Sequence, residues 1–267
     1  MKIKIKDNWR LNALVDEKKY TSMYQDSLDN NDSFWDKQGK RLNWKKKYTK
    51  IKDIKYSSKN VDINWYYDGK LNVSENCIDR HAKLNPNKIA IIWESDDPSV
   101  SINITYKELL LQVCKTANAL KKIGVKKGDR VTIYLTMIPE LAYVMLACSR
   151  IGAIHSIIFG GFSSESIAGR ILDCKSDFIV TADEGVRGGK TIPLKKITDK
   201  ALEKCPNVKK CLVVKKTNNK VNILSGRDEY LQDILSTVED YCEAEAMGAE
   251  DPLFILYTSG STGKPKG

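Results

Sequence analysis

The chain has 267 residues, a formal net charge of +10 and a hydrophobic share of 42%. This length suits one large domain or two ordinary ones, and the apolar share excludes a disordered chain. Lysines run through the whole sequence, and the densest cluster, residues 40–59, is interrupted by apolar residues. Nucleic-acid binding usually needs a fold motif as well as positive charge, so we expect a solvated face or arm here and no nucleic-acid partner.

The cysteines and histidines argue against a metal centre. Seven cysteines are scattered without a CxxC pair, which predicts free thiols in a reducing compartment. The two histidines, His81 and His155, are too few for a His-rich metal site, and we expect both to be structural. The first ten residues lack the apolar core of a signal peptide, and no apolar run approaches the ~18 residues of a membrane span. We therefore expect a cytoplasmic protein without a membrane segment.

Residues 1–80 are polar and lysine-rich, and we expect short helices and extended arms there without an independent core. Beyond residue 80 the sequence pattern of strands and helices becomes clearer. The β-rich run 88–94 and the residues 101–104 flank a turn, which predicts a strand pair. A helix follows over 105–124, in which Thr105 and Glu108 have capping-box spacing and Gly124 is placed to end the helix.

The rest of the chain alternates between strand-like and helical runs. The predicted strands cover residues 128–137, 153–160, 177–183, 209–216 and a buried run at 253–257. The predicted helices cover residues 139–152, which Pro139 opens, 163–174 and 227–242. This alternation predicts an α/β fold with parallel strands joined by crossover helices.

The closing stretch, YTSGSTGKPKG at 257–267, has the composition of a phosphate-binding loop. Its candidate contacts are the hydroxyls of Thr258, Ser259, Ser261 and Thr262, the backbone at Gly260 and Gly263, and the charge of Lys264 and Lys266. Backbone N–H groups together with a lysine suit polyphosphate. A P-loop would need glycine at 258 and Ser or Thr at 265, where this chain has Thr258 and Pro265. An ordinary glycine-serine surface loop is the alternative.

The stretch instead resembles the signature loop of the adenylate-forming, or AMP-binding, enzymes. Residues 150–195 and 246–267 are similar to the acetyl-CoA synthetase branch, and residues 20–78 to the amino-terminal extension of that branch. The resemblance implies an extension over residues 1–80 and the first part of a large adenylation domain over 81–267. We therefore expect the chain to be the front portion of an enzyme, stopping in its phosphate loop and inactive alone.

The resemblance also implies a reaction in two steps. A carboxylate and ATP give acyl-AMP and pyrophosphate, and the CoA thiol then displaces AMP. Residues Thr258 to Lys264 would surround the β- and γ-phosphates of ATP, with Thr258 and Lys264 as catalytic contacts. Magnesium would bind the phosphates, and its protein ligand would lie outside this chain.

For the second step, the resemblance implies that CoA is bound by Arg187, Gly188, Gly189 and Lys190. Arg187 and Lys190 suit the 3′-phosphate of CoA. Family members commonly carry arginine where Lys190 stands, and lysine loses the bidentate fork. A solvated turn with a chance basic pair is the alternative for this segment.

The identity of the acid stays open. Acetate is the expected substrate, with propionate and acetoacetate as alternatives, because the resemblance places the carboxylate pocket beyond Gly267. A non-catalytic basic module with a degenerate nucleotide loop is a further alternative of a different class.

Overall fold

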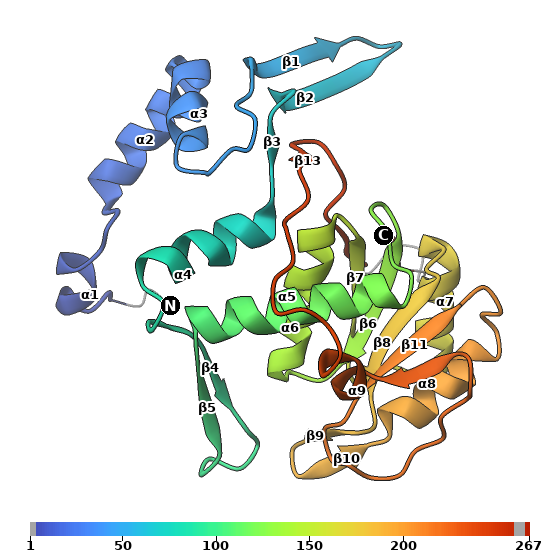
Figure 1. The fold of residues 1–267 in the computed structure, drawn as a ribbon. Coiled ribbons are helices and arrows are strands. Elements are labelled where there is room, and N and C mark those ends of the chain that lie inside the picture. The colour runs from blue at the N-terminus through green and yellow to red at the C-terminus, as the bar shows by residue number, and fades with distance from the viewer. Residues whose placement is uncertain (1–3, 259–264) are drawn as a thin grey trace. The chain divides into compact units, whose positions relative to one another are not determined.

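The computed structural model describes residues 4–258 and 265–267. The chain divides into two compact units (Figure 1). The first consists of Met1–Lys70 with Gly248–Glu250, and the second of Leu71–Met247 with Asp251–Gly267. Two short strands, β3 (Lys70–Leu71) and β13 (Met247–Gly248), lie where the chain passes from one unit to the other.

The first unit combines short helices with one hairpin. Its elements are α1 (Asp7–Leu11), α2 (Glu17–Asp29), α3 (Asn31–Gly39) and the antiparallel strands β1 (Lys50–Tyr56) and β2 (Val61–Tyr67). The rings of Trp44, Tyr48 and Tyr66 pack with centroids 4.9 to 5.4 Å apart. A Cβ at Gly39 would lie 2.7 Å from the Tyr66 ring. Glycine at this position lets the helix approach the aromatic cluster, which serves in place of a larger core.

The second unit is built on a six-stranded parallel sheet with the strand order β12-β11-β8-β6-β7-β14. Its strands are β6 (Arg130–Leu135), β7 (Ile154–Phe159), β8 (Phe178–Ala182), β11 (Lys210–Val214), β12 (Asp228–Tyr230) and β14 (Phe254–Ile255). Two antiparallel hairpins accompany it, β4 (Ile89–Glu94) with β5 (Ser101–Thr105), and β9 (Gly185–Arg187) with β10 (Lys190–Ile192). The helices are η1 (Glu75–Asp79), α4 (Arg80–Leu84), α5 (Tyr106–Lys122), α6 (Pro139–Ile151), α7 (Ser164–Cys174), α8 (Leu194–Leu202) and α9 (Leu231–Leu235).

The direction of winding reverses at β6. The chain passes from β6 to its neighbour β7 and then crosses back to β8 on the other side of β6. Because such crossovers are right-handed, α6 and α7 must lie on opposite faces of the sheet. Figure 1 shows this arrangement, with α5 and α6 on one face and α7 and α8 on the other. The predicted α/β fold with parallel strands is confirmed.

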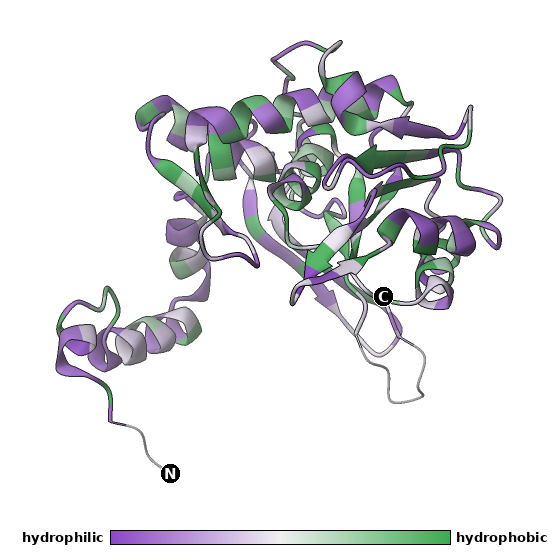
Figure 2. Ribbon diagram, turned by 90° about the horizontal axis from the view of Figure 1, so that it is seen from below, coloured by the Kyte–Doolittle hydropathy of each residue, from purple (hydrophilic) through white to green (hydrophobic). Residues whose placement is uncertain are grey.

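Local signals account for much of this unit. The capping box at the start of α5 is present, with the Glu108 N–H donating to Thr105 Oγ1 at 3.3 Å and the Thr105 N–H donating to Glu108 Oε2 at 2.8 Å. Gly124 follows α5 with a φ of +99°, and Pro139 is the first residue of α6. The sheet strands are largely apolar in Figure 2, and β6 and β8 are buried almost throughout.

The helix expected over residues 227–242 is wrong for most of its length. Strand β12 and the short helix α9 occupy its beginning, and residues 238–242 have no regular structure. The carbonyls of Glu239 and Tyr241 each accept a hydrogen bond of 2.8 Å from the Asn118 amide on α5. A side chain from another helix thus satisfies backbone groups that a helix would have paired within itself.

The buried strand expected over residues 253–257 is also wrong in its extent and burial. Only Phe254 and Ile255 form β14, which lies at the edge of the sheet beside β7. Phe254 and Leu256 remain 50% and 58% exposed. An edge strand has one neighbour, so the apolar run that resembles a central strand is half uncovered in the described residues.

Arg150 joins three segments of the second unit. Its side chain is 1% exposed, and its two terminal nitrogens donate to the two carboxylate oxygens of Asp79, each at 2.9 Å. Its Nε donates to the Cys242 carbonyl at 2.5 Å. Loss of one partner of such a buried pair usually costs about 3–5 kcal/mol, because the other charge is left uncompensated.

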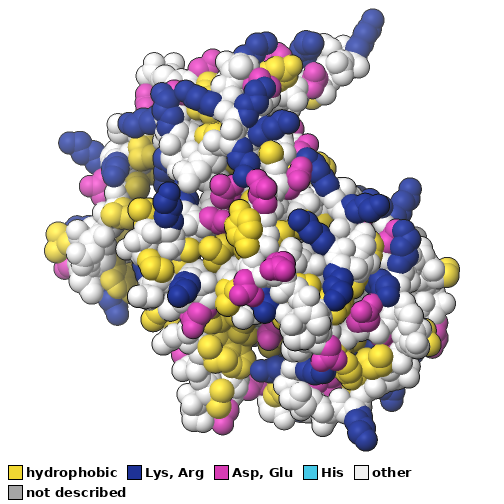
Figure 3. All heavy atoms as spheres, viewed as in Figure 1, with side chains coloured by type: hydrophobic (Ala, Val, Ile, Leu, Met, Phe, Trp, Pro, Cys, Tyr) yellow, Lys and Arg dark blue, Asp and Glu magenta, His cyan; other side chains and the backbone are white. Residues whose placement is uncertain are grey.

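Charges on the surface are mixed. On the face in Figure 3, Lys and Arg side chains stand among Asp and Glu side chains, without one continuous basic area. Among the described residues, no helix is both long enough and apolar enough to cross a membrane. All seven cysteines are free, and six of them are buried.

Candidate functional site

The reversal at β6 creates a crevice at the carboxyl ends of the strands. The connections that leave β6 and β8 run to opposite sides of the sheet, so the chain diverges between these neighbouring strand ends. In open α/β sheets, ligands bind at such a switch point. The structure has a cavity of about 310 Å³ there. This volume lies at the lower end of the range for small-molecule sites.

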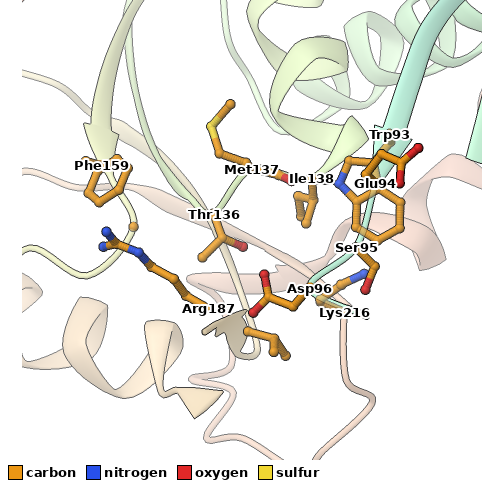
Figure 4. Close-up of a pocket in the computed structure, with 12 residues that line it drawn as sticks. Trp93, Glu94, Ser95, Asp96, Thr136, Met137, Ile138, Phe159, Arg187 and Lys216 are labelled. Carbon is orange, nitrogen blue, oxygen red and sulfur yellow. Dashed lines mark hydrogen bonds between the residues drawn. The ribbon is translucent and has the colours of Figure 1, made fainter. Parts of the chain in front are cut away.

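Segments that follow four of the sheet strands meet around this cavity, which we call the switch-point cavity (Figure 4). Its lining residues are Trp93 and Glu94 at the end of β4 with Ser95 and Asp96 after it, Thr136, Met137 and Ile138 after β6, Phe159 and Gly160 at the end of β7, Val186 and Arg187 in the hairpin after β8, and Lys216 after β11. Two cations, two carboxylates and two aromatic rings therefore share one cavity, which suits a ligand with both anionic and apolar parts.

The hairpin β9–β10 presents Arg187 to the cavity. Gly188 and Gly189 form its two-residue turn with φ values of +57° and +70°, and Arg187 and Lys190 pair directly across it. Positive φ at both turn residues is the requirement of a type I′ hairpin, which explains the two glycines. The Arg187 guanidinium lies 4.9 Å from the centre of the Phe159 ring, and Figure 4 shows it pointing toward that ring.

Two further glycines let segments approach one another closely beside Thr136, which lines the cavity. A Cβ at Gly185 would lie 2.4 Å from Thr136 Cγ2, and one at Gly160 would lie 2.9 Å from the Leu135 carbonyl oxygen. Any larger residue at either position would force these neighbouring atoms to shift.

Trp93 and Lys216 form the opposite wall. The Trp93 indole N–H donates to the Met137 carbonyl at 2.7 Å, which fixes the ring beside the end of β6. The Lys216 ammonium lies 4.5 Å from the centre of that ring. In the part of the chain that is described, Lys216 and Arg187 form no ion pair, so their N–H donors remain available to an anion.

The four residues expected to bind CoA thus lie in one hairpin, but they do not all line the cavity. Arg187 lines it, whereas Gly188 and Gly189 form the turn and Lys190 pairs with Arg187 outside the lining. The Gly189 N–H donates to Asp96 Oδ2 at 3.2 Å and ties the turn to the segment after β4.

The predicted phosphate-binding loop is described only at its two ends. The Thr258 N–H donates to the Lys266 carbonyl at 2.9 Å, and the Lys266 N–H donates to the Thr258 carbonyl at 3.1 Å. This antiparallel bridge brings the two ends of the loop together. The expected phosphate contacts Ser259, Gly260, Ser261, Thr262, Gly263 and Lys264 lie outside the described residues.

A second cavity, of about 560 Å³, adjoins the start of this loop and is lined by α7 residues together with Tyr257 and Pro265. The Tyr257 hydroxyl donates to Asp173 Oδ2 at 2.6 Å, and the Arg170 guanidinium lies 5.3 Å from the centre of its ring. Burial and the hydrogen bond to Asp173 raise the pKa of Tyr257, so this residue remains a neutral anchor that fixes the chain immediately before Thr258.

Both histidines lie outside the switch-point cavity. His155 is 4% exposed in β7, and His81 lies in α4 with its ring 5.1 Å from that of Tyr106. Across residues 4–258 and 265–267, no three His, Cys, Asp or Glu side chains gather in a group that could hold a metal ion. The magnesium that the resemblance implies has no ligand assigned among them.

The chain matches two family models. Residues 78–267 match the model described as AMP-binding enzyme, and residues 20–77 match that of the acetyl-coenzyme A synthetase N-terminus. The resemblance stated from the sequence is therefore confirmed.

Curated relatives agree with these matches. An acetyl-coenzyme A synthetase from Parvibaculum lavamentivorans is 58% identical over 259 residues, which are 97% of this chain and 40% of the relative. One from Mesorhizobium japonicum is 56% identical over 268 residues, which are 99% of this chain and 41% of the relative. The chain thus spans about 40% of the length of these relatives.

A solved structure shares the fold. The acetoacetyl-CoA synthetase from Streptomyces lividans superposes with a TM-score of 0.82 and 22% identity, covering 92% of this chain and 37% of that protein. At this identity the likeness concerns the fold alone, and it agrees with the parallel sheet and crossover helices described above.

Proposed function

Because the chain belongs to the AMP-binding enzyme family, we propose that it forms the ATP-phosphate and CoA-binding portion of a ligase that converts acetate into acetyl-CoA. The observation that carries this proposal is the placement of Arg187 in a cavity at the switch point of the sheet, on a chain that also ends in the family's phosphate signature. The choice of acetate rests on the relatives that are 56–58% identical.

In the first proposed step, a carboxylate oxygen of acetate attacks the α-phosphorus of ATP and pyrophosphate leaves. This step brings anions together, so cations and hydrogen-bond donors at the phosphates provide the main stabilisation. We assign the Thr258 hydroxyl and the Lys264 ammonium to the β- and γ-phosphates, with the backbone and hydroxyls from Ser259 to Gly263 completing the cradle. Magnesium, bound with ATP, would supply further neutralisation of the phosphate charge.

In the second proposed step, the CoA sulfur attacks the acyl carbon, AMP leaves and the thiol proton is released. Arg187 contributes by holding the phosphorylated nucleotide end of CoA at the switch-point cavity. Phe159 supports the guanidinium from behind and leaves its edge N–H groups to reach a phosphate. Lys190, opposite Arg187 in the hairpin, adds positive charge without the bidentate geometry of an arginine.

Activity is tested on the polypeptide that the complete gene encodes, which we call the native gene product. Acetate-dependent exchange of labelled pyrophosphate into ATP measures the first step, and acetyl-CoA formation measures both. We expect both activities, with acetate preferred over propionate and acetoacetate.

A preference for propionate or acetoacetate would leave the proposed ligase reaction unchanged and replace acetate as the acid on which it acts. Tight ATP binding without exchange for any of the three acids would favour a non-catalytic nucleotide-binding module. We further propose a cytoplasmic location, which the seven free cysteines support because such thiols persist in a reducing compartment.

A further inference from the structure

A buried carboxylate binds the backbone of Lys216, one of the residues that line the switch-point cavity. Asp183 follows β8 at once and is 1% exposed. In the described part of the chain no cation pairs with it. Its oxygens accept hydrogen bonds from four backbone N–H groups instead, those of Glu184 at 2.7 Å, Lys216 at 2.9 Å, Thr217 at 3.1 Å and Asn218 at 2.8 Å. Successive N–H groups that converge on one anion form a nest, and bonds to a charged acceptor are the stronger ones.

These bonds join two segments that are distant in the sequence. The turn at residues 216–218 follows β11, and the hairpin that begins at Gly185 follows β8. Glu184 reinforces the junction, because its Oε2 accepts from the Thr217 hydroxyl at 2.8 Å and from the Asn219 amide at 2.6 Å. Asn218 has a φ of +61°, a conformation that asparagine tolerates and that directs its N–H toward Asp183.

The two joined segments carry the two cations of the cavity. The Lys216 N–H is itself bound by Asp183, and Arg187 lies four residues beyond Asp183 in the hairpin. The Lys216 ammonium then lies against Trp93 on one wall, and the Arg187 guanidinium lies against Phe159 on the other. The carboxylate therefore binds the backbone of Lys216 directly and lies at the start of the segment that carries Arg187.

We propose that Asp183 is a positioning residue that fixes the separation of Arg187 and Lys216, and that Lys216 is a second cation for the phosphates of CoA. The proposal rests on the proposed CoA-binding function of this cavity. Asp183 itself touches no ligand. Its contribution reaches CoA only through the two cations that it holds in place.

The test separates positioning from a purely structural contribution. Asp183→Asn keeps the size of the side chain but turns an amide N–H₂ toward backbone donors and removes the charge. Asp228→Asn is the matched control, because Asp228 is another carboxylate at 4% exposure whose partner Lys195, at 2.9 Å, lies outside the cavity lining. Both variants are expected to lower the melting temperature of the native gene product.

Only Asp183→Asn is expected to weaken CoA binding. We expect its KM for CoA and its calorimetric dissociation constant to rise about tenfold, which corresponds to the loss of one charge-assisted contact. The rate of acetate-dependent pyrophosphate exchange should change less than about twofold, since that step uses no CoA. Lys216→Gln should raise the KM several-fold, and the two changes together should be less than multiplicative because Asp183 acts in part through Lys216.

Several results would overturn the proposal. An unchanged KM for CoA in a folded Asp183→Asn protein would do so, as would an equal rise in the Asp228→Asn control. If Asp183→Asn fails to fold, the test rests on Lys216→Gln, and an unchanged KM for CoA in that variant refutes the proposal. Binding of CoA is measured by calorimetry independently of turnover. A native gene product that binds CoA without catalysis contradicts the proposed ligase activity alone, whereas one that does not bind CoA contradicts both the proposed function and this inference.

Discussion

His155 provides a direct test of how burial sets the pH dependence of stability. The imidazole lies in β7 between β6 and β14, with its ring 5.7 Å from that of Phe254. Its Nδ1 has no hydrogen-bond partner among the described residues. Burial without a neighbouring carboxylate lowers the pKa of His155 from 6.5 to about 4. The folded protein therefore keeps this side chain neutral at a pH where the unfolded chain protonates it.

The sign and size follow from linkage. Between the unfolded pKa of 6.5 and the folded pKa of about 4, the unfolded state binds more protons, so stability falls as the pH falls through this window. One pKa unit corresponds to about 1.4 kcal/mol, so the loss amounts to about 2 kcal/mol between pH 7 and pH 5 and about 3 kcal/mol when complete.

The perturbation is His155→Leu, which removes the titrating group and fills a similar space with apolar atoms. We expect the variant to be at least as stable as the parent at pH 7, since no hydrogen bond of Nδ1 is lost, and less sensitive to acid. Melting temperatures of the native gene product and the variant are compared at pH 7, 6 and 5, with His81→Gln as the control that removes the other histidine. Parallel pH profiles for the parent and His155→Leu would refute the reasoning.

Three further outcomes concern the site and the sheet edge. Arg187→Ala is expected to raise the KM for CoA by about ten- to a hundredfold and to spare pyrophosphate exchange, and equal loss in both half-reactions would remove Arg187 from the CoA site. Lys264→Ala is expected to slow pyrophosphate exchange by about ten- to a hundredfold, and unchanged exchange would remove Lys264 from the phosphate site. Residues 1–267 expressed alone are expected to self-associate through the exposed side chains of Phe254 and Leu256. Light scattering that finds a monomer, or association unchanged by Leu256→Lys, would contradict the role of this edge.

Local chemistry explains what the sequence predicts well. The Thr105–Glu108 capping box, the Gly124 terminus and Pro139 act within one or two helical turns, so their signals are complete in a short stretch of residues. The parallel sheet can equally be predicted from the sequence, because alternating strand and helix runs leave few other ways to connect the chain.

The features that the sequence did not predict depend on contacts between residues that are distant along the chain. The stretch ending at residue 242 has helical composition, yet the Asn118 amide binds its backbone from α5. Trp93 and Lys216 reach one cavity only because the strand order reverses at β6, and no local pattern reveals that order. The hairpin around Gly188 did carry a local signal, since two glycines between strand-like residues are typical of a type I′ turn.

The buried Arg150 pair has a consequence for the kinetics of folding. Its partners Asp79 and Cys242 are 71 and 92 residues away in the sequence, so the pair cannot form until three remote segments have already met. Contacts of such long range require costly chain closure and are associated with slow folding. Interactions that form after the rate-limiting step act mainly on the unfolding rate. We therefore expect the Arg150 contacts to form late in folding, and to lengthen the lifetime of the folded unit more than they speed its formation.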